Sequence, residues 1–484
     1  MQKINVKKIL TKFEFWLVII ILSLAIFTRF YALKTTATFF WDQAYDLRQI
    51  QLFYTEKRIS LIGPISEEGD KVYSSLTYYM LLPFAVLGKF STVSTTYGAA
   101  VYGLLSAVFL VVLITKINKK AWLGAALVAA IWFPLIETSR WAWNPHLVLI
   151  WIALGLLFFQ RKTKLTLFLS GLFLGLSIHH HYLSFIATAA FIFLTLLQKY
   201  KSRDFKTYLW LVPGFAFAIL PFIAFDLTHP PGLFFSRLMM YQQNNVNRNL
   251  VTFIFDFFHN FYTVVRHYAG PSFSGALLAI YLLALMLFDF KKSKKHLLFI
   301  IVWFLQILGV TFIKDAYTHY FLPGLVFFVI YLYLPRKIIK VNIVLVSTFI
   351  LINGSLLSIV PQITTQKYMP AMWQPNIRTA DAITNILYHE VTQNNISGAN
   401  IAVLGSPDPN RYGWKYRSLL EIKGVQLKSK YEYFTNNYLF VVSTQTEENL
   451  RNDISPEMER FRYEKLLQTW YIEDSEWIVY LFSF

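Results

Sequence analysis

The stretch TYGAAVYGLLSAVFLVVLIT, residues 96–115, decides the fold class, because it runs for 20 residues without a charge. About 20 apolar residues of helix cross the roughly 30 Å hydrocarbon core of a bilayer. The next five residues, KINKK at 116–120, carry three lysines, which is typical of a loop on the cytoplasmic side. The stretch therefore predicts a membrane-spanning helix, and the same pattern recurs along the chain.

Composition supports the same class. Of the 484 residues, 56% are hydrophobic and 15% are charged, against about 25% charged in a typical soluble domain. Because the chain has no cysteine, disulfides and thiolate metal sites are excluded. We expect a mainly α-helical, polytopic membrane protein with about 11–13 membrane-spanning helices. The segments that fit are 15–33, 75–90, 96–115, 121–136, 145–160, 165–178, 182–198, 207–225, 274–290, 296–313, 316–334 and 341–360.

The net charge of +18 comes largely from short lysine and arginine blocks between these segments. Such blocks mark cytoplasmic loops, so the charge does not indicate a nucleic-acid partner. They place the N-terminus in the cytoplasm, and the last span then brings the C-terminal tail to the extracytoplasmic side of the plasma membrane. One segment breaks the alternation, because counting 75–90 gives an odd number of crossings between the first two basic blocks. It is short and contains Pro83, so it need not be a simple crossing.

The membrane domain, residues 1–360, has two long outer pieces. In the loop 34–74, apolar residues at helical spacing predict an amphipathic helix at the membrane interface over Asp42–Lys57. Gly63-Pro64 then predicts a turn. The second piece, 226–272, is polar in its middle and aromatic afterwards, and we assign it to an outer loop.

The tail, residues 361–484, predicts a small extracytoplasmic α/β domain. It contains no glycine-rich phosphate loop and no nucleophile elbow, so it offers no nucleotide site. Periodicity predicts helices over Asn376–Asn395, Tyr416–Ile422 and Pro456–Leu467, and strands over Ile401–Leu404, Leu439–Val442 and Ile478–Leu481.

Asp42 is the first candidate for chemistry, because it lies among aromatic residues in the outer loop. A carboxylate partly desolvated at a membrane surface has a raised pKa, which suits a general base. The alternative is that Asp42 is the N-cap of the amphipathic helix. Asp46 lies one turn further on, and Glu67 belongs to an acidic set in the same loop, so either is a possible second acid.

A second polar group follows the span 121–136. Arg140, within Ser139-Arg140-Trp141-Ala142-Trp143-Asn144-Pro145, could bind a phosphate through its planar guanidinium. Its alternative is an anchoring role at the interface. Glu137, one turn earlier, is either a partner of Arg140 or a further acid in the site.

Histidines gather on the same outer side. In His179-His180-His181, three adjacent imidazoles cannot all face one metal ion, so a single histidine facing a polar cavity, His181, is the better expectation. His319 and Tyr320 also fall at the outer surface. The sequence therefore requires no metal site, although it does not exclude a divalent ion.

These motifs, in this order, resemble the GT-C superfamily of polyprenyl-phosphate-sugar-dependent glycosyltransferases. The nearest branch is the prokaryotic one similar to protein O-mannosyltransferases and the lipid A aminoarabinose transferase. The resemblance covers about residues 15–335 and rests on short motifs with one-sided placement. They are Arg29-Phe30-Tyr31, Trp41-Asp42-Gln43-Ala44-Tyr45-Asp46, Gly63-Pro64, Ser139 to Pro145, Gly171 to Leu176 and His319-Tyr320-Phe321-Leu322-Pro323.

The resemblance implies an inverting transfer of a sugar from a polyprenyl-phosphate donor to an extracytoplasmic acceptor in the cell envelope. It implies Asp42 as catalytic base, and Arg140, His181, His319 and Tyr320 as donor-binding residues, with no nucleotide cofactor. Family members often carry another acid soon after the arginine, where this chain has Asn144 and His146. Two alternatives stay open, a transporter or flippase of lipid-linked glycans and a non-catalytic envelope-assembly partner.

Overall fold

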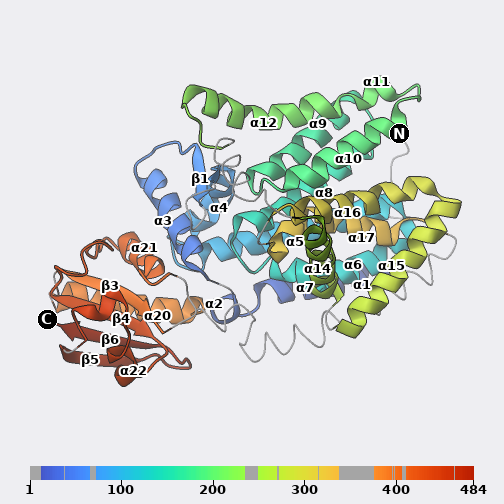
Figure 1. Cartoon of the computed structure of the whole chain (residues 1–484). Coiled ribbons are helices and arrows are strands. Elements are labelled where there is room, and N and C mark those ends of the chain that lie inside the picture. Colours follow the sequence, from blue (N-terminus) through green and yellow to red (C-terminus); the bar gives the residue numbers. More distant parts are fainter. Residues whose placement is uncertain are drawn as a thin grey trace. The chain divides into compact units, whose positions relative to one another are not determined.

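Helices form most of the chain (Figure 1). The computed structural model describes residues 12–37, 39–65, 72–234, 249–269, 272–313, 316–336, 375–394, 396, 398–405, 410–462 and 464–484. The chain divides into two compact units that do not follow sequence order. Unit 1 comprises residues 1–31, 62–77 and 99–360, and unit 2 comprises 32–61, 78–98 and 361–484.

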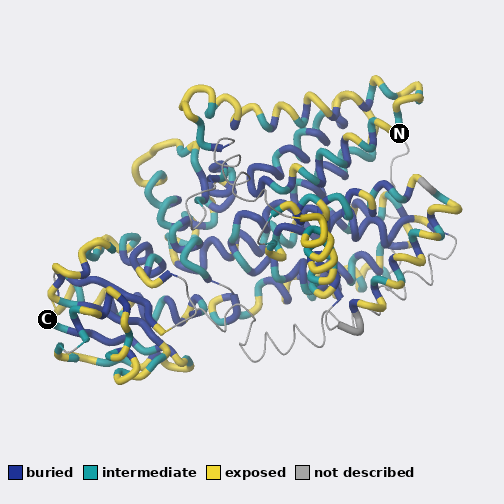
Figure 2. The backbone as a smooth tube through the Cα atoms, viewed as in Figure 1, coloured by how far each residue is buried: buried dark blue, intermediate teal, exposed yellow. Residues whose placement is uncertain are grey.

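Unit 1 is a helical bundle with one small hairpin. Its apolar core is contributed by helices along the whole unit, and Figure 2 shows buried and exposed residues alternating along several of them. Many of the exposed residues are large and apolar. The helices are α1 (Lys12–Phe30), α5 (Ser94–Ile117), η2 (Lys119–Ala121), α6 (Trp122–Ile131), α7 (Phe133–Glu137), η3 (Asn144–Leu147), α8 (Val148–Phe159), α9 (Lys164–Leu176), η4 (Ser177–His179), α10 (Ser184–Lys199), α11 (Phe205–Tyr208), α12 (Leu211–Thr228), α14 (Leu250–Ala269), α15 (Ser272–Lys292), η5 (Lys294–His296), α16 (Leu297–Thr311), η6 (Thr318–Phe321) and α17 (Leu322–Tyr333).

The predicted spans correspond to helices, but several are shorter or broken. Among the described residues, Ser94–Ile117 and Phe205–Thr228 are long and apolar enough to cross a membrane, and shorter apolar helices accompany them. The span predicted at 121–136 is broken at Trp132, where the backbone is extended, because Pro134 has no N–H to continue α6. The predicted span 341–360 lies outside the described residues.

One helix was not expected. We assigned 226–272 to an outer loop, but α14 occupies 20 residues of it. Its Tyr268 packs on Trp132 and accepts a hydrogen bond from the indole Nε1 through its carbonyl, at 2.9 Å. Polar residues along α14, such as Asn260, concealed the helix from a search for uninterrupted apolar runs.

Close helix packing in unit 1 depends on small residues. A Cβ added at Gly171 of α9 would lie 2.0 Å from the carbonyl oxygen of Leu211, and one at Gly214 of α12 would lie 2.0 Å from that of Phe168. Only glycine permits this approach, which is the usual way in which membrane helices maximise van der Waals contact.

The hairpin of unit 1 corrects one prediction. Strand β1 (Ile62–Ile65) pairs antiparallel with β2 (Val72–Ser74), so Gly63-Pro64 lies in a strand and does not form a turn. A Cβ at Gly63 would lie 2.0 Å from the Ser74 carbonyl oxygen, and a two-stranded sheet leaves edges on which proline is tolerated. The Gly-Pro pair therefore reflects close strand packing.

Unit 2 combines the outer-loop helices with the tail. It contains α2 (Leu33–Thr36), α3 (Trp41–Thr55), most of α4 (Leu76–Leu87), α20 (Ile377–Gln393), α21 (Trp414–Ile422), α22 (Glu447–Arg451) and α23 (Pro456–Glu459). The tail's four-stranded sheet has the order β3-β4-β6-β5, from β3 (Ala399–Leu404), β4 (Tyr438–Ser443), β6 (Ile478–Ser483) and β5 (Lys465–Tyr471). Only β3 and β4 are parallel, and both faces of the sheet carry apolar clusters.

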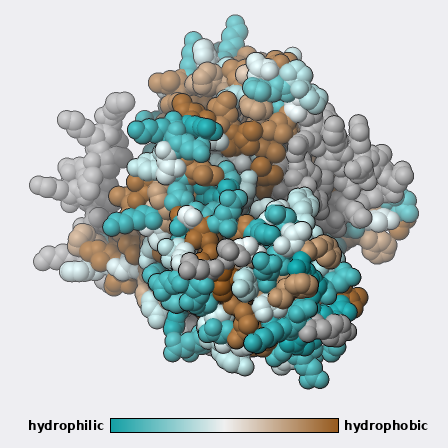
Figure 3. All heavy atoms as spheres, turned by 90° about the vertical axis from the view of Figure 1, so that its left-hand side faces the viewer, coloured by the Kyte–Doolittle hydropathy of each residue, from teal (hydrophilic) through white to brown (hydrophobic). Residues whose placement is uncertain are grey.

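The tail is therefore the predicted α/β domain, with one correction. The helix over Asn376–Asn395, the helix near Tyr416–Ile422 and the three strands are confirmed. The helix predicted over Pro456–Leu467 is wrong beyond Glu459, because Lys465–Tyr471 is the edge strand β5. Figure 3 shows that hydrophilic side chains dominate the face of the tail turned toward the viewer, as expected of a domain in water.

Helix α4 covers the predicted segment 75–90, which made the number of crossings between the first two basic blocks odd. Its 12 residues reach about 18 Å, well short of a bilayer core, and Pro83 lies inside it. From Tyr78 onward it belongs to unit 2. If this segment does not cross, two crossings are left between the first two basic blocks, as the predicted alternation requires, and the topology stays a prediction.

Candidate active site

Asp42 lies in the first turn of α3. The helix begins at Trp41, and its N-cap is Phe40, whose backbone is extended and whose N–H donates to Oε1 of Gln43. Asp42 therefore is not the N-cap, which was the alternative drawn from the sequence. Its Oδ1 accepts the backbone N–H of Gln43 at 2.9 Å. A carboxylate in the first turn is stabilised by the positive end of the helix dipole.

Asp46 lies one turn further along α3 and is 4% exposed. The Tyr78 hydroxyl donates to its Oδ1 at 2.9 Å. Burial raises the pKa of Asp46 well above its usual range, the charge of Asp42 raises it further, and the Tyr78 hydrogen bond opposes both. The helix thus carries two carboxyl groups of different environment, one half-buried and one buried.

The hydrophobic face of α3 fixes its orientation. Leu47 and Ile50 are fully buried and form an apolar cluster with Tyr78, Leu81 and Ala85 of α4. The predicted helix with an apolar face is therefore present, whereas its location at the membrane interface stays a prediction. The cluster also fixes the direction in which Asp42 and Asp46 point, because rotating α3 would expose Leu47 and Ile50.

Unit 1 brings together three residues that the sequence proposed for donor binding. The His181 ring lies 5.4 Å from that of His319 and 5.2 Å from that of Tyr320, measured between centroids. Trp143 lies 4.3 Å from His319, and Tyr73 stacks on His181 at 5.9 Å. We call Tyr73, Trp143, His181, His319 and Tyr320 the imidazole–aromatic cluster. Aromatic faces with a few polar groups are typical of sites for small ligands.

Two buried amides hold this cluster in place, and sequence reasoning missed both. Gln306 of α16 donates to the Tyr320 carbonyl oxygen at 2.7 Å and accepts the Ala187 N–H at 3.0 Å. Asn144 donates to the carbonyl oxygen of His180 at 2.6 Å. A single glutamine inside an otherwise apolar span is expensive unless it is paired, and this is the signal that could have identified Gln306.

The other two histidines are engaged in structural hydrogen bonds. His179 Nε2 donates to the Ala218 carbonyl oxygen at 2.6 Å, so the neutral ring accepts the Ser74 hydroxyl through Nδ1 at 2.7 Å. His180 Nε2 accepts from Trp151 at 2.8 Å, which leaves Nδ1 to donate to Thr77. Both rings therefore fix the start of α4 to α9 and its neighbours. Within the described ranges, no group of three or more His, Cys, Asp or Glu side chains is placed to hold a metal ion.

Arg140 is 2% exposed, and its guanidinium faces the end of α1. Nη1 donates to the carbonyl oxygens of Thr28 and Arg29 at 3.0 and 3.3 Å, and Nη2 donates to that of Tyr31 at 2.9 Å. These are helix C-terminal carbonyls, which a cation satisfies favourably. The geometry favours the anchoring alternative for Arg140, whereas the phosphate contact stays a prediction.

The three residues predicted as possible second acids do not lie together. Glu137 lies against His267 of α14, with 3.4 Å between Oε2 and Nε2. Glu67 lies outside the described residues. Asp46 is the one among these that lies on the same helix as Asp42.

Comparison with known proteins gives a structural match. No family model matches the sequence, and no curated protein matches it either. Two solved structures of ArnT from Cupriavidus metallidurans match nearly the whole chain. The form bound to undecaprenyl phosphate has a TM-score of 0.55 and 10% identity, and covers 96% of this chain and 97% of that one. The apo form has a TM-score of 0.53 and 10% identity, and covers 97% and 98%. The chain therefore has the fold of ArnT, which is that of a polytopic membrane protein with a C-terminal domain.

Proposed function

We propose that the protein is a membrane glycosyltransferase that takes a sugar from a polyprenyl-phosphate donor and passes it to an extracytoplasmic acceptor. The observation that carries the proposal is the fold, which matches over nearly its full length a transferase structure that contains undecaprenyl phosphate. A prenyl chain needs an apolar environment, and unit 1 exposes many apolar side chains along its helices.

Asp42 is the proposed catalytic base. The acceptor hydroxyl gives its proton to the Asp42 carboxylate while its oxygen forms a bond to the anomeric carbon of the donor sugar. The bond from that carbon to the phosphate oxygen breaks, and polyprenyl phosphate leaves with the electron pair. One displacement inverts the anomeric configuration. The Asp42 carboxylate is half-buried in the first helical turn, so an acceptor can reach it, whereas Asp46 is buried.

The imidazole–aromatic cluster is proposed to bind the donor. Stacked aromatic faces suit the apolar face of a sugar ring, and imidazole nitrogens can hydrogen-bond to hydroxyl or phosphate oxygens. In this proposal the half-buried His319 contacts the donor and the buried His181 packs against its ring, whereas Arg140 contributes by anchoring α1.

The test is to reconstitute the purified chain in liposomes with a panel of labelled polyprenyl-phosphate sugars and envelope acceptors. A transferase cleaves the donor and releases polyprenyl phosphate. Transfer of intact donor between leaflets without cleavage would instead support the transporter or flippase alternative.

A further inference from the structure

Unit 2 joins the helix that carries Asp42 to the C-terminal tail. Gln51 of α3 and Ile422 of α21 are separated by 371 residues, yet the Gln51 Nε2 donates to the Ile422 carbonyl oxygen at 3.1 Å. Chain connectivity does not impose this contact. The tail's sheet has apolar clusters of its own, so the contact must have another role than completing that core.

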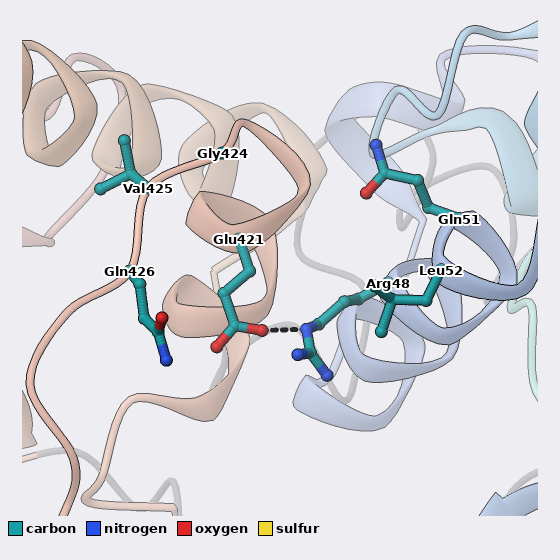
Figure 4. A pocket seen from close by; sticks show the side chains of 7 residues that line it. All are labelled: Arg48, Gln51, Leu52, Glu421, Gly424, Val425 and Gln426. Atoms are coloured by element: carbon teal, nitrogen blue, oxygen red, sulfur yellow. Dashed lines mark ion pairs between the residues drawn. The ribbon is translucent and has the colours of Figure 1, made fainter. Parts of the chain in front are cut away.

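We call the contact between α3 and α21 the joint. It contains an ion pair and an apolar contact as well. Arg48 of α3 pairs with Glu421 of α21 through Nε and Oε2, as Figure 4 shows. The Ile422 side chain packs against the cluster that contains Leu47 and Ile50. Three kinds of interaction therefore link α3 to the last turn of α21.

The tail also contacts the segment that follows α4. The Thr92 hydroxyl donates to Asp381 Oδ1 of α20, across 289 residues of sequence. Because α4 packs on α3 through Tyr78 and Leu81, this second link restrains the same helix pair from another direction.

The joint lies on the face of α3 away from Asp42. Each residue turns the helix by about 100°, so Arg48 and Gln51 are separated from Asp42 by roughly 120° and 180° around the axis, whereas Asp46 is separated by only about 40°. The tail therefore contacts α3 on a side of the helix that does not carry Asp42.

The joint is thin. A pocket of about 250 Å³ opens beside the ion pair, lined by Arg48, Gln51, Leu52, Glu421, Gly424, Val425 and Gln426 (Figure 4). Its α3 residues are the ones that face α21, so the pocket belongs to the contact between these two helices.

We propose that the tail is a positioning element for the catalytic helix, with Arg48 and Glu421 as its central positioning residues. This inference rests on the proposed role of Asp42. It assigns the tail a task in turnover, which is to keep α3 folded and oriented while the acceptor is deprotonated.

The test uses the full chain with Glu421→Gln, the charge swap Arg48→Glu with Glu421→Arg, and Gln51→Ala. Glu447→Gln is the matched control, because Glu447 pairs with Arg451 at 2.7 Å within the tail and has no place in the joint. Hydrogen–deuterium exchange of residues 41–55 is measured beside kcat and donor KM. Glu421→Gln should speed exchange in α3 and lower kcat, each by about threefold to fivefold, with donor KM unchanged. The charge swap should restore both, and Glu447→Gln should change neither.

Unchanged exchange in both Glu421→Gln and Gln51→Ala would overturn the positioning role, as would faster exchange with normal kcat. Exchange needs no catalytic activity, so it tests the joint even if the transferase function fails. Gln51→Ala leaves the ion pair intact, so its exchange rate and kcat test the proposal if Glu421→Gln does not fold.

Discussion

The Tyr78 hydroxyl donates a hydrogen bond to Asp46 Oδ1 at 2.9 Å, and this bond sets the buried carboxyl apart from Asp42. Asp46 is buried and its pKa is raised, chiefly by loss of water, whereas Asp42 is half-buried in the first turn. Two carboxyls one turn apart can therefore have different protonation states at neutral pH. This division agrees with the proposed roles, in which Asp42 meets the acceptor and Asp46 is its buried neighbour.

Asp46→Asn tests that division through stability. Because the pKa of Asp46 is raised on folding, the folded state binds its proton more tightly than the unfolded chain. The stabilisation from protonated Asp46 is then complete below the pKa of the unfolded chain, about 4, and is lost as pH rises through the pKa of the folded protein. Asparagine stays neutral and still accepts from Tyr78. The variant should therefore melt at a higher temperature than wild type at pH 7 and show no gain at pH 4. A lower melting temperature at pH 7 would show that Asp46 is ionised when folded.

Asp42→Asn removes the proposed base and keeps the size of the side chain. Turnover should fall by about 100-fold or more, because general-base catalysis contributes that much, while expression and donor KM stay unchanged. The measurement is steady-state release of polyprenyl phosphate by purified protein. Near-normal kcat in this variant would reject Asp42 as the base.

Arg140→Ala separates anchoring from phosphate binding. The guanidinium donates to the carbonyl oxygens of Thr28, Arg29 and Tyr31, so its loss should cost about 2–3 kcal/mol of stability and reduce the folded yield. The protein that folds should show a normal kcat/KM for the donor. A large rise in donor KM at full yield would restore the phosphate role that the sequence suggested.

His319→Phe tests the imidazole–aromatic cluster. Phenylalanine keeps the ring that packs against Trp143 but lacks the nitrogens. If His319 hydrogen-bonds to the donor, KM for the donor should rise about tenfold or more, with little change in melting temperature. Gln306→Leu serves as a comparison, because it should displace Tyr320 and lower stability as well. An unchanged KM in His319→Phe would remove this residue from the donor site.

Much of the fold was predictable from patterns that depend on local chemistry. Uninterrupted apolar runs gave the membrane class, and the periodicity over Asn376–Asn395 gave α20. Strand β5 was missed because it is an edge strand with irregular burial, so it has no regular alternation. Helix α14 was missed because its polar residues interrupt the apolar run.

The site was predictable only in part, for a physical reason. Asp42, His181 and His319 attract attention as polar residues in apolar surroundings, whatever their partners are. The hydrogen bonds of Arg140 to α1 and the ion pair of Arg48 with Glu421 join segments far apart in sequence. No local pattern encodes such contacts, so the anchoring of Arg140 and the link between α3 and the tail required the structure.

Membrane orientation can be tested because the chain lacks cysteine. Single cysteines at Ser66, Ser272 and Ser406 should react with an impermeant thiol reagent from outside the cell. Cysteines at Ser202 and Ser293 should react only after the membrane is opened. Protection at Ser66 with labelling at Ser406 would place the first loop on the wrong side for the proposed reaction.

The most direct test of the glycosyltransferase function is mass spectrometry of envelope lipids, glycans and proteins in a deletion strain. The strain is complemented in turn with wild type, Asp42→Asn and an empty vector. The account predicts that the deletion loses one sugar from an envelope acceptor and accumulates the intact polyprenyl-phosphate sugar. Wild type should reverse both changes, and Asp42→Asn should reverse neither although it is present in the membrane. Full restoration of the sugar by Asp42→Asn, or an envelope unchanged by the deletion, would contradict the account.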